Sequence, residues 1–502
     1  MINFVKKYYL FFCLTGIIVL YFFTRLFHIL TLPIFTDEAI YIHWTQVAAN
    51  DASWRFISLT DGKQPMYIWV AIFFYKTIHD PLLAGRLVSV GTGLVSTIGM
   101  FFLGREIFKN TKIGLLSSLL YALYPFALVY DKMAMYDSMV AMFIIWILYF
   151  TILLVRHVRF DLGMILGMVI GAGMLTKTNA DFGFILLPFA LLLFPFKKHF
   201  DKRRLYLLFL YSLVALVIAN AMYAILRLSP YYYIIGQKNL TFIYSFHDFI
   251  RQPFAFVVGN TQGLGGWFIE YMTIPFLVLV LATFFVDRKF FREKLFLLIW
   301  FIVPFILFAF DGKVLYPRYL LNMTMSLIPL GAYAFYVLQA KIKQVSIKIL
   351  LFLVFTSMFI VNDYLLLTNF ANAYIPQPDK GQYLTDWPSG VGVNQTVSFL
   401  QSQQGKIYVG TEGTFGLMPY ALQIYLYKNP NITINGFWPI NATPPQELLD
   451  AARKMPTYVV FYQDCPSCTA VGKAPSTWPV TQIFSIKKIA PNTYYTLYKL
   501  NP

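Results

Sequence analysis

The sequence predicts a polytopic α-helical membrane protein that carries a soluble α/β domain at its C-terminal end. Of its 502 residues, 58% are hydrophobic and only 13% are charged, a composition that excludes an ordinary soluble globular protein. Apolar runs of nearly 20 residues, long enough to cross a hydrocarbon core, recur up to about residue 365. Beyond residue 366, Asn, Gln, Pro and Gly become frequent and no such run follows. We therefore expect a membrane domain at 1–365 and a soluble domain at 366–502.

The apolar runs predict about eleven membrane spans. The first run is too long for a signal-peptide core and lacks a small-residue cleavage pattern, so we expect it to remain as a span. The predicted spans lie at 8–30, 82–104, 113–131, 136–155, 161–177, 180–196, 204–228, 265–286, 295–310, 317–338 and 347–365.

Basic residues lie in short clusters between the apolar runs. A net charge of +17 could indicate nucleic-acid binding, but the clusters fall at every second connection, as the positive-inside rule requires. We therefore expect a multi-pass plasma-membrane protein with no nucleic-acid partner, a cytoplasmic N-terminus and an extracytoplasmic C-terminus. The clusters are Lys6/Lys7, Arg105/Lys109/Lys112, Arg156/Arg159, Lys197/Lys198/Lys202/Arg203/Arg204, Arg288/Lys289/Arg292/Lys294 and Lys341/Lys343/Lys348.

The segment 65–78 is apolar but has only about 14 residues, which is marginal for a crossing. If it crossed the membrane, every later basic cluster would face outside. We therefore expect an interfacial helix on the outer face, rich in Trp and Tyr. The first outer loop, 31–81, then carries Asp37, Glu38 and Lys63 in one compartment.

The C-terminal region has the alternating pattern of a small α/β domain. Strands are predicted at 406–410, 432–435 and 458–462, and helices at 417–427 and 444–454, with Thr443 and Gln446 spaced as a capping box around Pro444. Cys465 and Cys468 predict a local disulfide on the outer face. A redox site uses the same spacing but is less favoured, because no helix signal follows the pair. The domain shows no evident catalytic constellation.

Charged groups at the predicted outer membrane face form a short set drawn from several connections. Each one alone could be solvated in a loop or reach the interface with its long side chain. Together they could converge on a cavity, because ionisable residues at the rim of a membrane protein are costly and often functional. The set is Asp37, Glu38, Lys63, Asp131, Lys132, Asp137, Lys177, Asp311, Lys313 and Arg318.

An ordered series of motifs in residues 1–365 resembles the C-type membrane glycosyltransferases, in particular the branch of protein O-mannosyltransferases and lipid A aminoarabinose transferases (glycosyltransferase family 39-like). Two positions depart from the family pattern: Gln64 stands in the place of a proline, and a glycine does not follow Lys177. The motifs are Asp37-Glu38, Lys63-Gln-Pro-Met-Tyr-Ile-Trp69, Ala84-Gly-Arg-Leu87, Tyr136-Asp137, Leu175-Thr-Lys177 and Pro317-Arg-Tyr-Leu320.

The resemblance implies transfer of a sugar from a polyprenyl phosphate to an acceptor on the outer side, with inversion at the anomeric carbon. A single displacement needs one general base, for which Asp37 is the candidate. Glu38 is expected to orient the acceptor or the neighbours of Asp37, or to be a solvated or helix-capping acid.

Lys63, Lys177 and Arg318 are the candidates for binding the donor phosphate, where fixed positive charge favours departure of the leaving group. Their alternative role is to reach from span ends to the interface. Asp137 and Tyr316 are expected to position substrate, although Asp137 could instead be an acid at a helix N-terminus.

No cofactor is certain from the sequence. Asp37, Glu38 and Asp137 offer oxygen ligands that Mg²⁺ or Mn²⁺ would accept, so a divalent metal stays open. The acceptor, which could be a protein, a lipid or a glycan, also stays open.

Two other functional classes are considered. A secondary transporter or lipid-linked sugar flippase would favour ionisable residues near the middle of the bilayer and broken helices in repeated halves. A membrane-anchored assembly protein would need only one or two spans. Neither pattern is apparent in the sequence.

Overall fold

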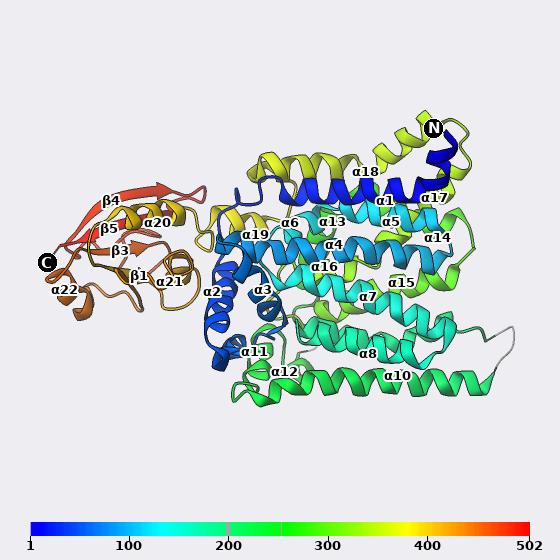
Figure 1. The fold of residues 1–502 in the computed structure, drawn as a ribbon, viewed down its shortest axis with the longest axis horizontal. Helices are drawn as coiled ribbons and strands as arrows, with labels where there is room; N and C mark the ends of the chain where they lie inside the picture. Colours follow the sequence, from blue (N-terminus) through cyan, green and yellow to red (C-terminus); the bar gives the residue numbers. More distant parts are fainter. Residues whose placement is uncertain (1, 197–200, 253, 502) are drawn as a thin grey trace. The chain divides into compact units, whose positions relative to one another are not determined.

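The computed structural model describes residues 2–196, 201–252 and 254–501, and it is predominantly helical up to residue 380 (Figure 1). Lys197 and Lys198 of the fourth predicted basic cluster lie outside the described residues. The helices are α1 Ile2–Leu26, α2 Thr36–Asn50, α3 Met66–Thr77, α4 Pro81–Phe108, α5 Thr111–Ala122, α6 Pro125–Asp131, α7 Tyr136–His157, α8 Phe160–Met174, α9 Phe182–Ile185, α10 Lys202–Tyr223, α11 Ile234–Phe242, α12 Phe246–Arg251, α13 Val257–Met272, α14 Ile274–Val286, α15 Phe291–Asp311, α16 Tyr319–Thr324, α17 Ile328–Ala340, α18 Val345–Thr368, α19 Gln377–Lys380, α20 Val393–Ser402, α21 Leu417–Gln423 and α22 Gln446–Ala452.

Six helices within the described part of the chain are long and apolar enough to cross a membrane. The number rises to eight if the bent pairs α5 with α6 and α13 with α14 each count as one span. The other three predicted runs, 161–177, 180–196 and 317–338, fold as shorter helices and 3-10 turns, which is why a count by length falls below the eleven predicted spans. The protein is therefore an integral membrane protein, and segment 65–78 forms the short helix α3.

The chain forms two compact units. Unit 1 comprises residues 1–27, 56–67 and 87–376, and unit 2 comprises 28–55, 68–86 and 377–502. These units do not follow the predicted division at residues 365 and 366, because two early segments pack with the C-terminal region.

In unit 1, α7, α8 and α10 run side by side (Figure 1). The contact between α8 and α10 is close because α8 presents glycines at every fourth position: Gly163, Gly167 and Gly171. A Cβ on Gly167 would lie 2.7 Å from the carbonyl oxygen of Ala215 in α10. Small residues at this spacing let helix backbones approach each other within a membrane.

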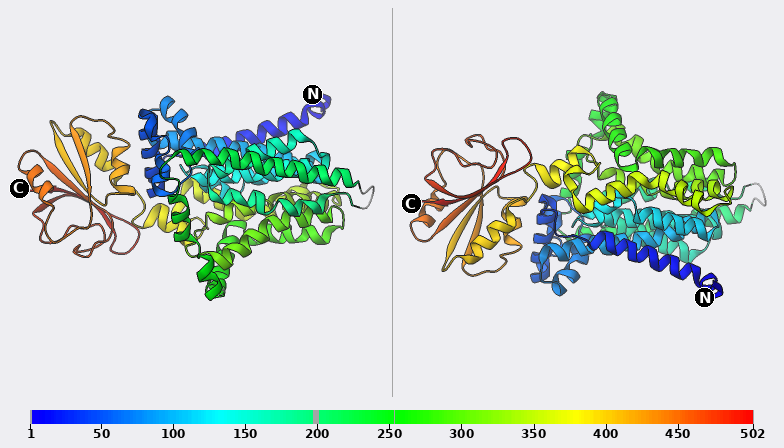
Figure 2. Two further views of the ribbon diagram at one scale, coloured as in Figure 1. Left: turned by 90° about the horizontal axis from the view of Figure 1, so that it is seen from below. Right: turned by 90° about the horizontal axis from the view of Figure 1, so that it is seen from above.

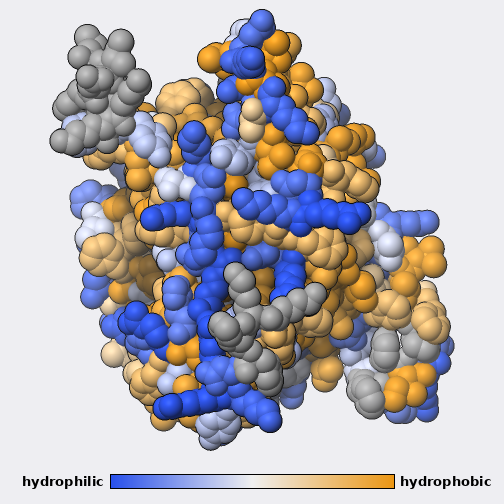
Figure 3. Space-filling view, turned by 90° about the vertical axis from the view of Figure 1, so that its right-hand side faces the viewer, coloured by the Kyte–Doolittle hydropathy of each residue, from blue (hydrophilic) through white to orange (hydrophobic). Residues whose placement is uncertain are grey.

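The basic clusters of four connections meet at one end of unit 1. Arg156 pairs with Glu106 at 3.0 Å and with Glu293 at 3.3 Å, and Arg204 donates to the carbonyl oxygen of Arg156 at 2.6 Å. Arg292 donates to the carbonyl oxygen of Phe194. Figure 3 shows hydrophilic side chains gathered on an end face of the molecule. These contacts explain how clusters far apart in the sequence can share one side of a membrane.

The C-terminal part of unit 2 is built on a five-stranded sheet with the order β2-β1-β3-β5-β4. The first three strands in this order are parallel, whereas β5 and β4 are antiparallel to their neighbours. Every residue of β1 and β3 is buried, as expected for strands covered on both faces. Figure 2 shows the sheet and its helices in two further views. The strands are β1 Ile407–Glu412, β2 Ile432–Phe437, β3 Thr457–Phe461, β4 Val480–Lys487 and β5 Tyr494–Leu500.

The predicted α/β character, the three predicted strands and the Cys465–Cys468 disulfide are confirmed. The sequence did not reveal β4, β5 or α20. The predicted capping box is wrong, because α22 begins at Gln446 after Pro445 and has no side-chain cap. The physical reason is that Pro444 stands directly before Pro445. The helical conformation is disfavoured for a residue that precedes a proline, so Pro444 stays outside the helix.

Candidate functional site

Asp37 lies in the first turn of α2 and is partly buried. The carboxylate of the next residue, Glu38, is fully buried and caps the same helix: its Oε2 accepts the backbone N–H of Phe35 at 2.9 Å. Among the roles considered for Glu38, this contact agrees with a helix-capping acid, and its burial excludes a solvated acid. Its role in orienting the acceptor or the neighbours of Asp37 stays a prediction.

Arg86 holds Glu38 in place. Its Nε and Nη2 donate to the two carboxylate oxygens at 2.9 and 2.8 Å, and both side chains are completely buried. The same guanidinium donates to the carbonyl oxygens of Ile29, Leu32 and Pro33. One side chain thus fixes both the start of α2 and the loop before it, and with them the backbone of Asp37.

Helix α2 packs within unit 2 against the C-terminal domain. The backbone N–H and the hydroxyl of Thr36 both donate to the carbonyl oxygen of Pro388, and Gln46 donates to that of Ile424. The ring of His43 stacks on Tyr420 of α21 with centroids 4.2 Å apart. Burial lowers the pKa of His43 to about 4, so it is a neutral packing residue at physiological pH.

Unit 1 brings four of the predicted site residues into one cluster. Lys177 Nζ lies 2.8 Å from Asp137 Oδ1 and 5.0 Å from the ring centroid of Tyr319. Tyr319 contacts Tyr316 edge-on, and the guanidinium of Arg318 lies 4.7 Å from the centre of the Tyr316 ring. Asp137, Lys177, Tyr316 and Arg318 are therefore linked through Tyr319, a residue that was part of a motif but not a predicted site residue.

Lys63 is held near the Lys177 turn by neighbouring residues. Gln64 donates to the hydroxyl of Thr178 at 3.0 Å, and the backbone N–H of Met66 donates to the carbonyl oxygen of Leu175 at 3.0 Å. Gln64, which departs from the family pattern, thus makes a contact that a proline could not make. Lys63 Nζ lies 5.4 Å from the ring centroid of Phe242 in α11, a contact that the sequence did not reveal.

Two other members of the predicted charged set have structural roles. Asp131 is buried and accepts hydrogen bonds from Arg25 at 3.3 Å and from Ser138 at 2.7 Å. Lys132 donates to the carbonyl oxygen of Phe27. These contacts tie α1 to the segment between α6 and α7.

Comparison with known proteins fits this architecture. Residues 62–223 match the family described as dolichyl-phosphate-mannose-protein mannosyltransferase. The fold is similar to ArnT from Cupriavidus metallidurans, at 15% identity over 98% of each chain with a TM-score of 0.57. The chain therefore has a GT-C-like fold.

Two further solved structures are similar to this fold. One is ArnT from the same organism bound to undecaprenyl phosphate, at 14% identity over 98% of each chain with a TM-score of 0.57. The other is the Archaeoglobus fulgidus oligosaccharyltransferase tethered with an acceptor peptide, at 12% identity with a TM-score of 0.57. That match covers 92% of this chain and 70% of the other. No match was found among curated protein sequences.

Two of the three carboxylates considered as ligands of a divalent metal are paired with cations. Both oxygens of Glu38 accept from Arg86, and Asp137 pairs with Lys177. Among the described residues, Glu412, Cys465 and Cys468 also lie close enough to hold an ion, but the disulfide removes the thiolates that would bind it. No step below uses a metal.

Proposed function

We propose that this protein is an inverting glycosyltransferase that moves a sugar from a polyprenyl phosphate to an acceptor hydroxyl on the outer face of the membrane. The observation that carries the proposal is the cluster in unit 1 in which Asp137, Lys177, Tyr319, Tyr316 and Arg318 contact one another in series. Such a set of cations and aromatic rings suits a phosphate joined to a sugar. The undecaprenyl phosphate bound by the similar ArnT supports the assignment of the donor class.

The proposed reaction is one displacement. Asp37 accepts the proton of the acceptor hydroxyl while the acceptor oxygen bonds to the anomeric carbon of the sugar. The bond between that carbon and the phosphate oxygen breaks, and the electron pair leaves with the polyprenyl phosphate. Attack from the face opposite the leaving group inverts the anomeric centre.

The cations take different parts in this step. The guanidinium of Arg318 suits bidentate contact with a phosphate, whereas Lys63 and Lys177 act as compact charges. Negative charge grows on the phosphate as the bond breaks, so fixed cations lower the barrier. Asp137 sets the position of Lys177, and Tyr316 sets that of Arg318.

The proposed site faces the outside of the cell. The cluster of Asp137, Lys177, Tyr319, Tyr316 and Arg318, the cation–tyrosine cluster, lies at the Asp137 end of α7. The basic clusters of unit 1 lie at the Arg156 end. The positive-inside rule makes the Arg156 end cytoplasmic. A disulfide in the C-terminal domain is typical of an oxidising compartment, which supports the same orientation.

The test is transfer of a labelled sugar from a polyprenyl phosphate by the purified protein. Asp37→Asn should reduce turnover by at least about 100-fold, the usual contribution of a general base. Asp450→Asn, at an exposed acid in the C-terminal domain, is the matched control and should leave the rate unchanged. Near-normal turnover of the Asp37→Asn protein would remove Asp37 from the role of base.

Donor binding has a test of its own. Arg318→Ala should raise the KM for the donor lipid and lower kcat, and Arg318→Lys should recover only part of the loss because lysine cannot form the bidentate contact. If donor affinity and rate are both unchanged, Arg318 is not a phosphate-binding residue.

A further inference from the structure

The loop 386–389 of the C-terminal domain carries four successive backbone carbonyl groups, and three of them converge on one side chain. Lys488, the residue after β4, donates from Nζ to these three oxygens and is only 4% exposed. The acceptors and their distances from Nζ are Asp386 at 3.2 Å, Trp387 at 3.3 Å and Ser389 at 2.6 Å. A protonated lysine has three N–H donors, so one ammonium group fixes the shape of this loop.

The remaining carbonyl group of the loop, that of Pro388, is bonded to the start of α2 within unit 2. Its oxygen accepts the backbone N–H and the hydroxyl of Thr36 at 3.1 and 3.0 Å. Directly after the loop, the N–H of Gly390 donates to the carbonyl oxygen of Ile34 at 2.7 Å. These contacts flank the N-cap residue of α2. The loop therefore holds the residues that lead into Asp37.

Two buried cations thus fix the start of α2. Arg86 does so directly, by binding three carbonyl oxygens of the chain before the helix. Lys488 does so through the loop 386–389. The first N–H groups of a helix have no partner inside it, so contacts from outside decide where the helix begins and how it lies. The N–H of Thr36 is such a group, and the loop supplies its acceptor.

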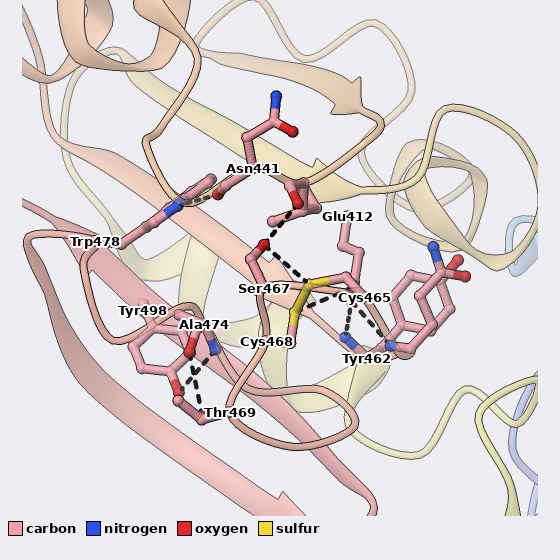
Figure 4. Close-up of a disulfide and its surroundings, with 12 residues drawn as sticks. Glu412, Asn441, Tyr462, Cys465, Ser467, Cys468, Thr469, Ala474, Trp478 and Tyr498 are labelled. Atoms are coloured by element: carbon pink, nitrogen blue, oxygen red, sulfur yellow. Dashed lines mark hydrogen bonds between the residues drawn. A yellow bond between two sulfur atoms is a disulfide. The ribbon is translucent and has the colours of Figure 1, made fainter.

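An aromatic contact also anchors the loop to the domain. The ring centroid of Trp387 lies 6.2 Å from that of Tyr462. Tyr462 is itself fixed, because its backbone N–H donates to Oε2 of Glu412 at 2.8 Å, next to the disulfide of the domain (Figure 4). This contact keeps the loop on the domain, whereas the bonds from the lysine set the directions of its carbonyl groups.

We propose that Lys488 is a positioning residue for the general base: by gathering three carbonyl groups of the loop 386–389, it directs the fourth to Thr36 and so sets the place of Asp37. Lys488 takes no part in bond making. A base displaced by about 1 Å from its working position can cost about 100-fold in rate. This inference rests on the proposed function, because it takes Asp37 as the base.

The first test is amide hydrogen exchange of the full-length protein in detergent, without substrate. It is made at pH 6, below the pKa of about 7 that burial gives Lys488, so that the ammonium group is intact. Lys488→Met should speed exchange of the N–H groups of Thr36 and Gly390 by about tenfold, the scale of one lost hydrogen bond. Exchange in the central strands β1 and β3 should not change.

The matched control is Lys428→Met. Lys428 is another lysine of the C-terminal domain that contacts α2, but at its other end, where Nζ donates to Asn50 at 3.0 Å. This variant should leave the exchange of Thr36 and Gly390 as it is. Unchanged exchange in the Lys488→Met protein would overturn the inference. Loss of protection throughout the sheet would also overturn it, because the lysine would then maintain the whole domain.

The second test is the kinetics of sugar transfer. Lys488→Met should lower kcat by about tenfold or more, while the KM for the donor lipid stays within about twofold, because the proposed donor-binding cations lie in unit 1. Lys488→Arg should recover part of the rate, since a guanidinium also donates to several carbonyl oxygens. A raised KM with an unchanged kcat would remove Lys488 from this role.

A double variant tests the route through the loop. Thr36→Val keeps the shape of the side chain but removes the hydroxyl that donates to Pro388. If Lys488 acts through Pro388, both changes weaken the same contact, so the loss of kcat in the double variant should be smaller than the product of the two single losses. A loss equal to that product would show that the two residues act independently.

The two proposals fail separately. Hydrogen exchange uses no donor, so unchanged exchange in the Lys488→Met protein would end this inference even while sugar transfer remains dependent on Asp37. If the unmodified protein transfers no sugar from polyprenyl phosphate, the proposed function is lost, and exchange still decides whether Lys488 holds the start of α2.

Discussion

At the scale of single residues, Arg86 decides the geometry around Asp37. It neutralises the buried carboxylate of Glu38 and binds three carbonyl oxygens of the preceding loop. A buried charge of this kind is tolerated only when its partner remains, because desolvation is otherwise uncompensated. The residue that prepares the site thus lies 49 positions after the proposed base in sequence, in the next membrane helix.

Removing Arg86 should therefore be more costly than removing an exposed arginine. Arg86→Ala is expected to lower the free energy of unfolding by about 3–5 kcal/mol, because it leaves Glu38 buried without a partner. The paired change Arg86→Met with Glu38→Gln should recover much of this loss. Thermal unfolding of the purified protein measures both.

The control for this prediction is Arg453→Ala, since Arg453 forms an exposed pair with Asp450 and should contribute less than about 1 kcal/mol. A loss for Arg86→Ala no larger than that of the control would show that the buried pair does not stabilise the fold.

Glu412 predicts a pH dependence of the C-terminal domain. Burial raises its pKa to about 7, above the usual value of 4.5. The folded state therefore holds a proton that the unfolded state loses between pH 4.5 and 7, so stability falls as pH rises through this window. The expected loss is about 3 kcal/mol. Glu412→Gln, which resembles the protonated acid, should remove this slope in thermal unfolding measured from pH 4.5 to 8.

Lys488 has the opposite effect in a separate window. Burial lowers its pKa from 10.5 to about 7, so the unfolded state holds the extra proton and stability rises with pH above 7. A slope between pH 4.5 and 7 that is the same in the Glu412→Gln protein would contradict the assignment to Glu412.

At the scale of elements, the contact of α8 with α10 shows how the membrane part is packed. Gly163 and Gly171 of α8 meet α10 as closely as Gly167 does: their added Cβ atoms would lie 2.8 Å from the carbonyl oxygen of Tyr211 and 2.9 Å from Sδ of Met222. The hydrophobic effect contributes little between helices surrounded by lipid, so close van der Waals contact between the backbones stabilises the pair instead.

Gly167→Leu should accordingly separate the two helices and lower the melting temperature, because no neighbouring side chain can yield where the obstacle is backbone. Gly16→Leu is the matched control, since a Cβ at Gly16 meets nothing within 4 Å and α1 is also an apolar helix. Equal melting temperatures for the two variants would show that the glycine contact is not needed for packing.

The secondary-structure elements were easier to predict from the sequence than the contacts between distant residues. Hydropathy alone located the apolar runs, and the spacing of Cys465 and Cys468 predicted their disulfide, because both signals are local. The partners of Glu38 and Lys177 were not predictable, since Arg86 and Asp137 are 48 and 40 residues away in sequence. Strand β4 was missed because its exposed polar residues interrupt the apolar pattern. The adjacent β5 was also missed, although only Lys499 of this strand is exposed.

At the scale of the whole molecule, α7 separates two kinds of charge in unit 1. Asp137 in its first turn belongs to the cation–tyrosine cluster, and Arg156 in its last turn belongs to the basic clusters. A helix rises 1.5 Å per residue, so these two positions are about 28 Å apart, close to the thickness of a hydrocarbon core. The proposed donor-binding cations and the cations that set the proposed topology would thus act at opposite membrane faces.

Cysteine labelling tests this orientation independently of activity. With Cys13 replaced by Ala, a cysteine introduced at the exposed Asn441 should react with an impermeant maleimide added to whole cells. A cysteine at the exposed Lys343 should react only after the membrane is opened. The reverse pattern would invert the proposed topology.

Unit 2 is assembled from segments that lie far apart in the sequence, and this has a consequence for the synthesis of the protein. Its segments 28–55 and 68–86 leave the ribosome long before residues 377–502, with which they form a compact unit. At ordinary rates of synthesis, the roughly 290 residues between them take roughly 15 to 60 seconds to appear. The helix that bears Asp37 cannot pack against residues 377–502 until they have been synthesised. A truncated nascent chain would therefore reach the membrane without the complete unit 2. Activity would then begin only once the entire polypeptide is complete.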